Sequence, residues 1–175
     1  AEKTEEDNKI WMLPYEYSHD AAGRCTTLQY RERLVRPRHK LEWKMPVHEY
    51  LGFAGAIEGT INTDFDHRVR VIHRKQHSSK VREVGRNLRI LKSYVAKAYE
   101  SDIRALHYLG FEYAAQGDGG SALRLLKRHA ALEMWPDQRM LSLLGICEVY
   151  RAIQDWDSVI YWAGQAIQCR SWPEP

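Results

Sequence analysis

The chain has 175 residues, of which 44% are hydrophobic and 28% charged, and its formal net charge is +3. This length suits one ordinary domain or two small ones with a buried core, and the composition excludes an intrinsically disordered protein. No apolar run approaches the roughly 20 residues that cross a bilayer, so we expect no membrane span. Three widely spaced cysteines without metal-ligand spacing favour a reducing compartment, here the cytoplasm.

Charge is segregated along the chain. The opening stretch, AEKTEEDNK, is acidic and is neither a secretory signal nor a usual translation start, so we expect a fragment or a processed product. From Arg68 to Lys92 there are nine Lys or Arg residues and one acid, Glu83. Such a stretch can attract phosphate. For any one of these basic residues, a place on a solvated helix face is the better interpretation. Aromatic residues are also not interleaved with the charges, as they are on surfaces that bind single-stranded nucleic acid. Nucleic-acid binding is therefore a weak hypothesis.

The first half of the chain reads as extended. KIWMLPYEYS and CTTLQYRERLV are rich in aromatic and branched residues and alternate as strands do, and DAAGR between them supplies a turn. The sequence therefore predicts two strands joined at residues 20–23. EWKMPVHEYL (residues 42–51) is predicted to be a third short strand or its approach, and HRVRVIH (residues 67–73) a fourth. Residues 64–66 read as a loop that enters this fourth strand.

From Ser79 onward the apolar period becomes helical. One amphipathic helix is predicted from apolar residues three and four positions apart, namely Val81, Val84, Leu88, Leu91 and Val95. Two helices separated by a GDGG turn follow in residues 103–136, and residues 137–173 repeat that plan.

The repeat is close to the tetratricopeptide period, since Gly110 and Gly145 lie 35 residues apart. The first unit follows the tetratricopeptide order, with Leu in place of the leading Trp, at Leu106, Leu109, Gly110, Tyr113, Ala122, Leu126 and Pro136. The second unit has Glu148 where Tyr is expected, and its other matching residues are Leu141, Leu144, Gly145, Val159, Ala163, Ala166 and Pro173. Gly and Ala let paired helices approach closely. We favour this repeat over an ordinary helical bundle.

The order of the motifs resembles one group of bacterial and phage glycosyltransferases. RERLVR (residues 31–36), EWKMPVHEYL, the strand end VIH (residues 71–73) and helical hairpins follow each other as in family 2 inverting enzymes with the GT-A fold. Their "R-x-F-R" strand precedes "W-x-x-x-V-H-E", matched here by Trp43, Val47, His48 and Glu49. Their "i-x-H" and "rN-x-x-iL" motifs match residues 72–73 and 86–91.

The resemblance implies an α+β chain in two domains. Residues 1–78 would be the β-rich C-terminal remnant of a GT-A catalytic domain, and residues 79–175 an all-α tetratricopeptide-like helical hairpin domain. The family's nucleotide-binding half, with its Asp-x-Asp metal motif, would precede this chain and be its partner. Asp64-Phe65-Asp66 has the right letters but follows the V-H-E segment, so we assign it no metal role. We expect this chain alone not to catalyse transfer.

The resemblance also implies the reaction. A nucleotide-sugar donor, a protein or glycan acceptor and a divalent metal, Mn²⁺ or Mg²⁺, would take part. An inverting transferase needs a carboxylate base for the acceptor hydroxyl. Glu49 is the candidate base, and His48 would orient it or the acceptor. Glu49 could instead cap the turn that precedes Leu51.

The remaining candidates bind metal or substrate. His73 stands where a family histidine completes the metal coordination, with His77 as second choice. Arg33 and Arg36 would contact the diphosphate, and Trp43 would lie on the substrate side. Each has a structural alternative. His73 could merely end its strand, and Arg33 and Arg36 could be exposed strand residues.

Two further classes of function stay open. The chain could be a non-catalytic tetratricopeptide scaffold for protein–protein interaction, with a structural β-rich cap, or a basic nucleic-acid-binding adaptor. In the transferase reading, the helical repeats would bind the acceptor or assemble a homo-oligomer.

Overall fold

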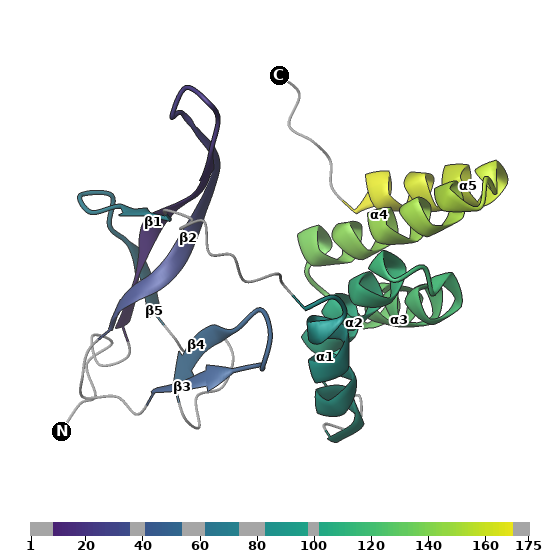
Figure 1. The fold of residues 1–175 in the computed structure, drawn as a ribbon, viewed down its shortest axis with the longest axis horizontal. Coiled ribbons are helices and arrows are strands. Elements are labelled where there is room, and N and C mark those ends of the chain that lie inside the picture. Colours follow the sequence, from purple (N-terminus) through teal and green to yellow (C-terminus); the bar gives the residue numbers. More distant parts are fainter. Residues whose placement is uncertain (1–8, 36–40, 54–61, 74–82, 98–101, 170–175) are drawn as a thin grey trace. The chain divides into compact units, whose positions relative to one another are not determined.

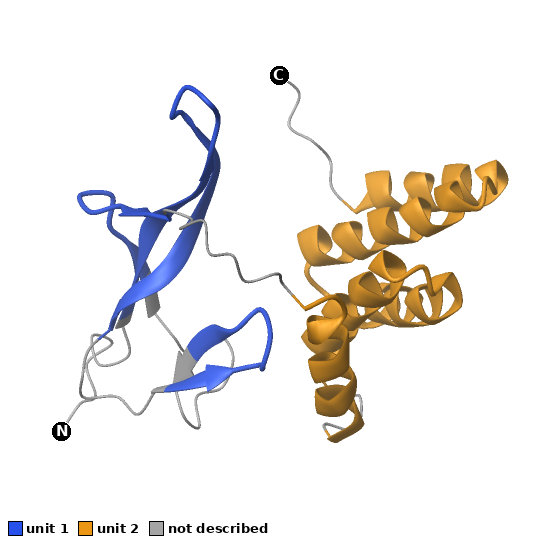
Figure 2. Ribbon diagram, viewed as in Figure 1, with its two compact units in different colours: residues 1–81 blue, residues 82–175 orange. Residues whose placement is uncertain are grey.

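A computed structural model describes residues 9–35, 41–53, 62–73, 83–97 and 102–169. The chain divides into two compact units, residues 1–81 and 82–175 (Figure 2). The described part of the first unit is built from strands and that of the second from helices, so the predicted α+β class is confirmed. The predicted boundary between residues 78 and 79 lies outside the described residues.

The main sheet of the first unit is organised around its longest strands (Figure 1). β1 (Lys9–His19) pairs antiparallel with β2 (Cys25–Val35) along one edge. Along its other edge β1 pairs in parallel with β5 (Asn62–Phe65) and then with β6 (Val71–Ile72). The β1–β2 turn falls where it was predicted, because the Asp20 carboxylate accepts backbone hydrogen bonds from Ala22 and Arg24, both at 2.9 Å.

Pro14 lies inside β1, although proline cannot donate to a strand ladder. The register explains this position. β5 pairs with β1 as far as Met12, and β6 begins to pair at Tyr15. Pro14 therefore falls in the gap between two parallel partners, where no ladder bond is lost.

The predicted fourth strand was wrong in extent. Only Val71 and Ile72 form β6, whereas the predicted loop at residues 64–66 lies largely in β5, which ends at Phe65. Asp66 then accepts hydrogen bonds from the backbone N–H and the guanidinium of Arg68, at 2.9 and 2.6 Å. These bonds lower the pKa of Asp66 to about 2 and hold a local turn that interrupts the alternating HRVRVIH pattern.

A separate two-stranded sheet carries the EWKMPVHEYL segment. β3 (Leu41–Lys44) pairs antiparallel with β4 (Tyr50–Phe53), with Lys44 opposite Tyr50. The segment was predicted to be a third short strand or its approach, whereas it contains the end of one strand, a turn and the start of a second strand. Residues 45–49, termed the 45–49 turn below, connect the two strands.

Five helices form the described part of the second unit: α1 (Arg86–Lys97), α2 (Ile103–Ala115), α3 (Gly119–Leu132), α4 (Pro136–Ala152) and α5 (Trp156–Gln168). Each packs against the next along the chain. The Asp-x-x-Ser caps of α3 and α5 match, because Asp118 and Asp155 each accept the backbone N–H three residues on, at 3.0 and 3.1 Å. The amphipathic pattern predicted α1 too early: Val84 precedes the helix and is 83% exposed.

The helices approach closely at two glycines. A methyl group on Gly110 would lie 2.8 Å from two Leu126 side-chain carbons, and one on Gly145 would lie 2.7 Å from the Phe111 ring. The predicted close approach of the two helices of one hairpin is therefore confirmed at Gly110. At Gly145 the close contact is instead with α2 and α3 of the preceding hairpin. Leu126 is fully buried and belongs to a core that joins α3, α4 and α5. Within the part of the chain that the structure describes, no helix combines the length and apolarity that a bilayer span needs.

Candidate functional site

The 45–49 turn presents the predicted catalytic pair to solvent. Met45 and Val47 are buried, whereas His48 and Glu49 are exposed. The backbone φ angle is 64° at Met45 and 58° at His48, both in the left-handed region that non-glycine residues rarely adopt. Such strain is concentrated at functional sites and persists only where packing imposes it. Here the two buried side chains anchor the turn and leave the Glu49 carboxylate accessible.

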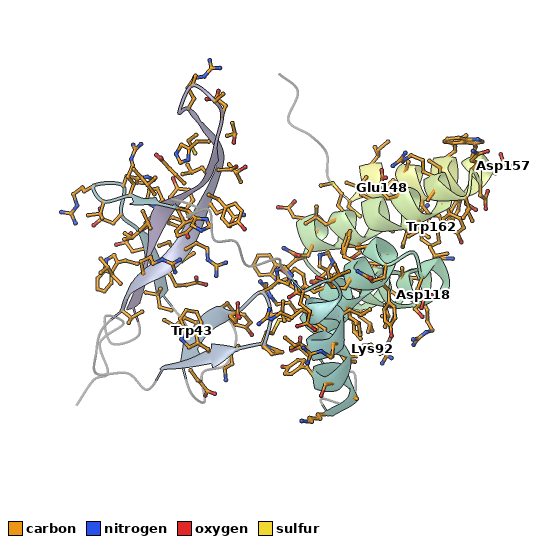
Figure 3. The ribbon with its side chains drawn as sticks, viewed as in Figure 1. Trp43, Lys92, Asp118, Glu148, Asp157 and Trp162 are labelled. Carbon is orange, nitrogen blue, oxygen red and sulfur yellow. The ribbon has the colours of Figure 1, made fainter. Side chains whose placement is uncertain are left out.

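The turn is anchored to the main sheet by an arginine. The Arg31 side chain on β2 donates a hydrogen bond from Nη2 to the backbone carbonyl of Glu49, at 2.9 Å. On the preceding strand, the predicted substrate-side residue Trp43 is 61% exposed (Figure 3). The RERLVR and W-x-x-x-V-H-E motifs are therefore in direct contact.

Two other predicted residues meet at one aromatic ring. The Arg33 guanidinium lies 5.0 Å from the centre of the Tyr15 ring, and the His73 ring centre lies 5.7 Å from it. Tyr17 extends this group, with its ring centre 5.2 Å from that of His73. A bulge places Arg33 here, because Trp11 pairs with Leu34 and Met12 with Glu32, so the β1–β2 register skips Arg33. We call Tyr15, Tyr17, Arg33 and His73 the Tyr15 face.

His73 has the features of a ligand residue. Its backbone N–H donates to the Glu16 carbonyl at 2.9 Å, which fixes its position beside β1. Its Nδ1 atom is buried and has no hydrogen-bond partner among the described residues. A buried imidazole nitrogen without a partner is costly in isolation and can be satisfied by a metal or a substrate group.

The other candidates do not join this face. Arg36 and His77 lie outside the described residues. Asp64 pairs with Trp11, four residues along β1 from Tyr15, which corresponds to about 13 Å of strand. The structure therefore offers no support for a metal shared by Asp64 and His73.

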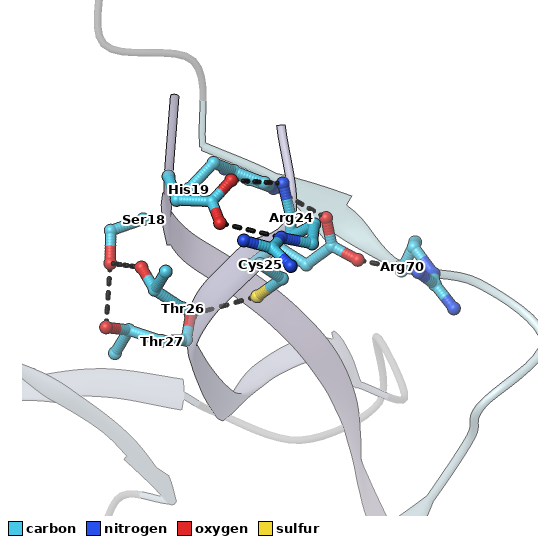
Figure 4. A network of polar contacts seen from close by, with 9 residues as sticks. Ser18, His19, Arg24, Cys25, Thr26, Thr27 and Arg70 are labelled. Atoms are coloured by element: carbon cyan, nitrogen blue, oxygen red, sulfur yellow. Dashed lines mark hydrogen bonds and ion pairs between the residues drawn. The ribbon is translucent and has the colours of Figure 1, made fainter. Parts of the chain in front are cut away.

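A second cluster, which sequence reasoning missed, has donor types that can bind a metal (Figure 4). One donor atom from each of Glu16, His19 and Cys25 lies within 4.8 Å of the others. Glu16 is buried, and its two oxygens lie 2.8 Å from His19 Nε2 and 2.6 Å from Arg70 Nη1. The hydrogen bond from His19, followed by the hydrogen bond and the charge of Arg70, lowers the pKa of Glu16.

This cluster does not fit the metal expected of a transferase. Thiolate and imidazole ligands favour Zn²⁺, whereas Mn²⁺ and Mg²⁺ prefer oxygen. The Arg70 guanidinium also balances the Glu16 charge, which satisfies the carboxylate without an ion. His73 contacts Tyr15, and successive side chains of a strand point to opposite faces, so His73 lies on the other face from Glu16. His19 and Cys25 come together because they pair across the β1–β2 hairpin. Their separation along the sequence does not by itself reveal this pairing, so sequence reasoning missed the cluster.

The helical unit contains a buried polar network. The Ser142 hydroxyl lies 2.7 Å from His107 Nδ1 and 2.9 Å from His129 Nδ1, and His129 Nε2 lies 3.3 Å from Glu133. If His129 donates to Glu133, its Nδ1 accepts from Ser142, which in turn accepts from His107. Ser142 and His129 are almost completely buried, so no substrate reaches this network. It joins α2, α3 and α4 and is part of the packing.

No family model matches the chain, and no curated protein matches it.

Proposed function

We propose that the first unit is the acceptor-side part of a nucleotide-sugar-dependent inverting glycosyltransferase. The supporting observation is that β2 brings the separate motifs together. Arg31 holds the backbone of Glu49, while Arg33, two residues further along the same strand, shares the Tyr15 ring with His73. The three motifs of the first unit, R-x-F-R, W-x-x-x-V-H-E and i-x-H, therefore contact one another or a common residue.

In this proposal each side chain has a separate task. The exposed Glu49 carboxylate accepts the proton of the acceptor hydroxyl as that oxygen attacks the sugar. His48, the exposed neighbour of Glu49 in the 45–49 turn, would orient Glu49 or the acceptor. Arg33 supplies a cation for the leaving diphosphate, and the exposed Trp43 ring offers a surface for a sugar or a peptide.

A divalent metal, Mn²⁺ or Mg²⁺, would be held in part by His73, whose buried Nδ1 has no partner among the described residues. The metal would neutralise charge on the departing nucleotide. The remaining ligands and the donor site would come from the nucleotide-binding half expected before this chain.

We propose that the second unit is a tetratricopeptide-like repeat that binds the acceptor or assembles the enzyme. Its support is that two glycines 35 residues apart each lie at a close helix contact. Gly110 on α2 contacts α3 of its own hairpin, and Gly145 on α4 contacts α2 and α3 of the preceding hairpin. The alternative function, a non-catalytic scaffold, has the same support, so activity must decide between them.

The test is sugar transfer by the full-length polypeptide that contains this chain, screened against nucleotide sugars with Mn²⁺ or Mg²⁺. Glu49→Gln should reduce the rate by roughly 10²–10⁴-fold, the usual contribution of a general base. Glu42→Gln is the matched control, because Glu42 is an exposed glutamate nearby on β3 that pairs with Lys44. Transfer by Glu49→Gln at the normal rate would exclude Glu49 as the base, and absence of transfer with every donor would favour the scaffold.

A second readout addresses the metal. His73→Ala should raise the metal concentration needed for half-maximal rate more than it lowers the rate at saturating metal. His67→Ala is the control, because His67 is exposed and contacts Tyr30 rather than the Tyr15 face. An unchanged metal requirement in His73→Ala would remove His73 from the site.

A further inference from the structure

The outer side of α5 carries an unusual apolar surface. Trp156, Ile160 and Ile167 are 56%, 72% and 69% exposed, and they follow each other at steps of four and seven residues. Gly164 lies between the two isoleucines, and a methyl group there would meet no described atom within 4 Å. At helical spacing these four residues form one stripe along α5, termed the α5 stripe. The helix is about 20 Å long.

The other side of α5 is already buried. Ala166 belongs to the core, and Trp162 packs against the same core (Figure 3). The helix is therefore apolar on two sides, and such helices are normally covered on both. Contiguous exposed apolar surface of this kind marks an interaction site.

A comparison with α3 shows what fits the stripe. Asp118 and Asp155 are the N-cap residues of α3 and α5, so equivalent positions of the two helices can be found by counting from them. Five and twelve residues after the cap, α3 has Leu123 and Ala130, and both pack in the core that contains Leu143 and Ile146 of α4.

At the same positions α5 has Ile160 and Ile167. The α5 stripe is thus the counterpart of the α3 surface that receives another helix. The continuity of this helix stack points to an α-helix with branched aliphatic residues as the occupant.

The charge of α5 indicates which helix this is. Asp157 is the single charged residue of α5. A two-fold contact places each surface against its own copy, so a strongly charged surface would repel itself. The α5 stripe is free of this conflict, and antiparallel helices also align their dipoles favourably.

We propose that the α5 stripe binds the α5 stripe of a second copy of this chain, in a two-fold antiparallel pair. The contact buries Trp156, Ile160 and Ile167 of both copies, and Gly164 lets the two helices approach closely. A single pair of short helices gives a small interface, so the dimer dissociates on dilution. This inference specifies the surface for the assembly role proposed for the second unit, and it does not depend on the proposed transferase activity of the first unit.

The test is the molar mass of the purified 175-residue chain by sedimentation or light scattering over a wide range of protein concentration. We expect a monomer–dimer equilibrium and a thermal midpoint that rises with concentration. Ile160→Asp should weaken association by at least about tenfold, because a carboxylate would be buried without a partner.

The matched control is Met134→Asp, at a side chain of the same unit that is 88% exposed and lies outside α5. It should leave the equilibrium unchanged. Ile167→Lys is a second stripe variant of opposite charge, and the far-ultraviolet circular dichroism of each variant checks that the helices remain folded.

A chain that is monomeric at every concentration would overturn the proposal, and the α5 stripe would then be expected to bind a helix of another protein. A dimer that both stripe variants leave intact would overturn it as well, since the contact would then lie elsewhere.

Discussion

The close approach of α2 and α3 makes a quantitative prediction for Gly110→Ala. The new methyl group would lie 2.8 Å from Cγ and Cδ2 of Leu126, where 3.4 Å is the start of ordinary contact. Leu126 is 0% exposed and belongs to the packed core, so a shift by the required roughly 0.6 Å would press on its core neighbours. Overpacking of this kind costs about 1–3 kcal/mol, and the better helix propensity of Ala returns about 1 kcal/mol. The expected net loss in the free energy of unfolding is therefore up to about 2 kcal/mol.

Gly120→Ala is the matched control for this prediction. Gly120 lies in α3, and a methyl group there has one ordinary contact, with the Asp118 carboxylate at 3.8 Å. The variant should be neutral or stabilised by up to about 1 kcal/mol. Denaturant unfolding followed by the helical circular dichroism signal should separate the two variants by at least about 1 kcal/mol.

A double mutant isolates the clash. Leu126→Ala alone should cost about 2–5 kcal/mol, because it empties a fully buried site. In the Gly110→Ala/Leu126→Ala protein the new methyl group has room, so the combined loss should fall short of the sum by about 0.5–3 kcal/mol. Additive losses, or a Gly110→Ala protein as stable as Gly120→Ala, would refute the argument that this glycine is required by the helix contact.

Two further predictions concern the helical unit. Gln154, just before the Asp155 cap, has a left-handed φ of 59°, and the equivalent residue of the preceding hairpin is Gly117 with φ 80°. Gln154→Gly should therefore raise the free energy of unfolding by about 0.5–1 kcal/mol in a denaturant titration. The reason is that the relieved backbone strain exceeds the entropy that glycine adds to the unfolded chain. Burial lowers the pKa of His129, so the unfolded chain binds a proton more readily and stability should fall as the pH drops below the ordinary histidine value of 6.5. In His129→Gln the free energy of unfolding, measured at several pH values, should fall less steeply below pH 6.5. A fall as steep as in the original protein would show that another group takes up the proton.

The helices were the most predictable part of the fold. Apolar residues at steps of three and four recur through residues 103–168, and aspartates stand at three of the helix starts. Local signals therefore define these elements. Gly110 and Gly145 could also be predicted as contact points, because a glycine that recurs at the same point of two helices indicates close helix packing. The start of α1 was predicted too early because Val84 continues the apolar pattern outside the helix.

The main sheet was less predictable because its pairing is not local. β5 has four residues, NTDF, with little strand character, and it exists because it pairs in parallel with the start of β1. HRVRVIH alternates better, yet the bonds between Asp66 and Arg68 interrupt it. Strand propensity depends on which partner is adjacent, and the sequence does not state the partner.

The candidate site shows the same division between local and non-local information. Glu49, His48 and Trp43 could be selected from one segment, but the Tyr15 face depends on a bulge at Arg33 and on the strand β6 that carries His73 to Tyr15. The Glu16, His19 and Cys25 cluster depends on the same hairpin register, and a shift of one residue would move Cys25 to the opposite face. Sequence patterns therefore indicated which chemical groups are present, and the register decided which of them meet.

The 45–49 turn combines both levels. The segment was predicted to be a third short strand or its approach, and its Met45 and Val47 side chains are buried. The chain nevertheless reverses there, because the backbone adopts left-handed φ values at Met45 and His48 and pairs β3 with β4. Burial of the apolar residues leaves the next two side chains exposed, and the bond from Arg31 fixes the Glu49 carbonyl relative to β2. This packing is thus what presents the proposed base, so substitutions at Met45 or Val47 should change the position of Glu49 and, with it, the rate of the proposed sugar transfer.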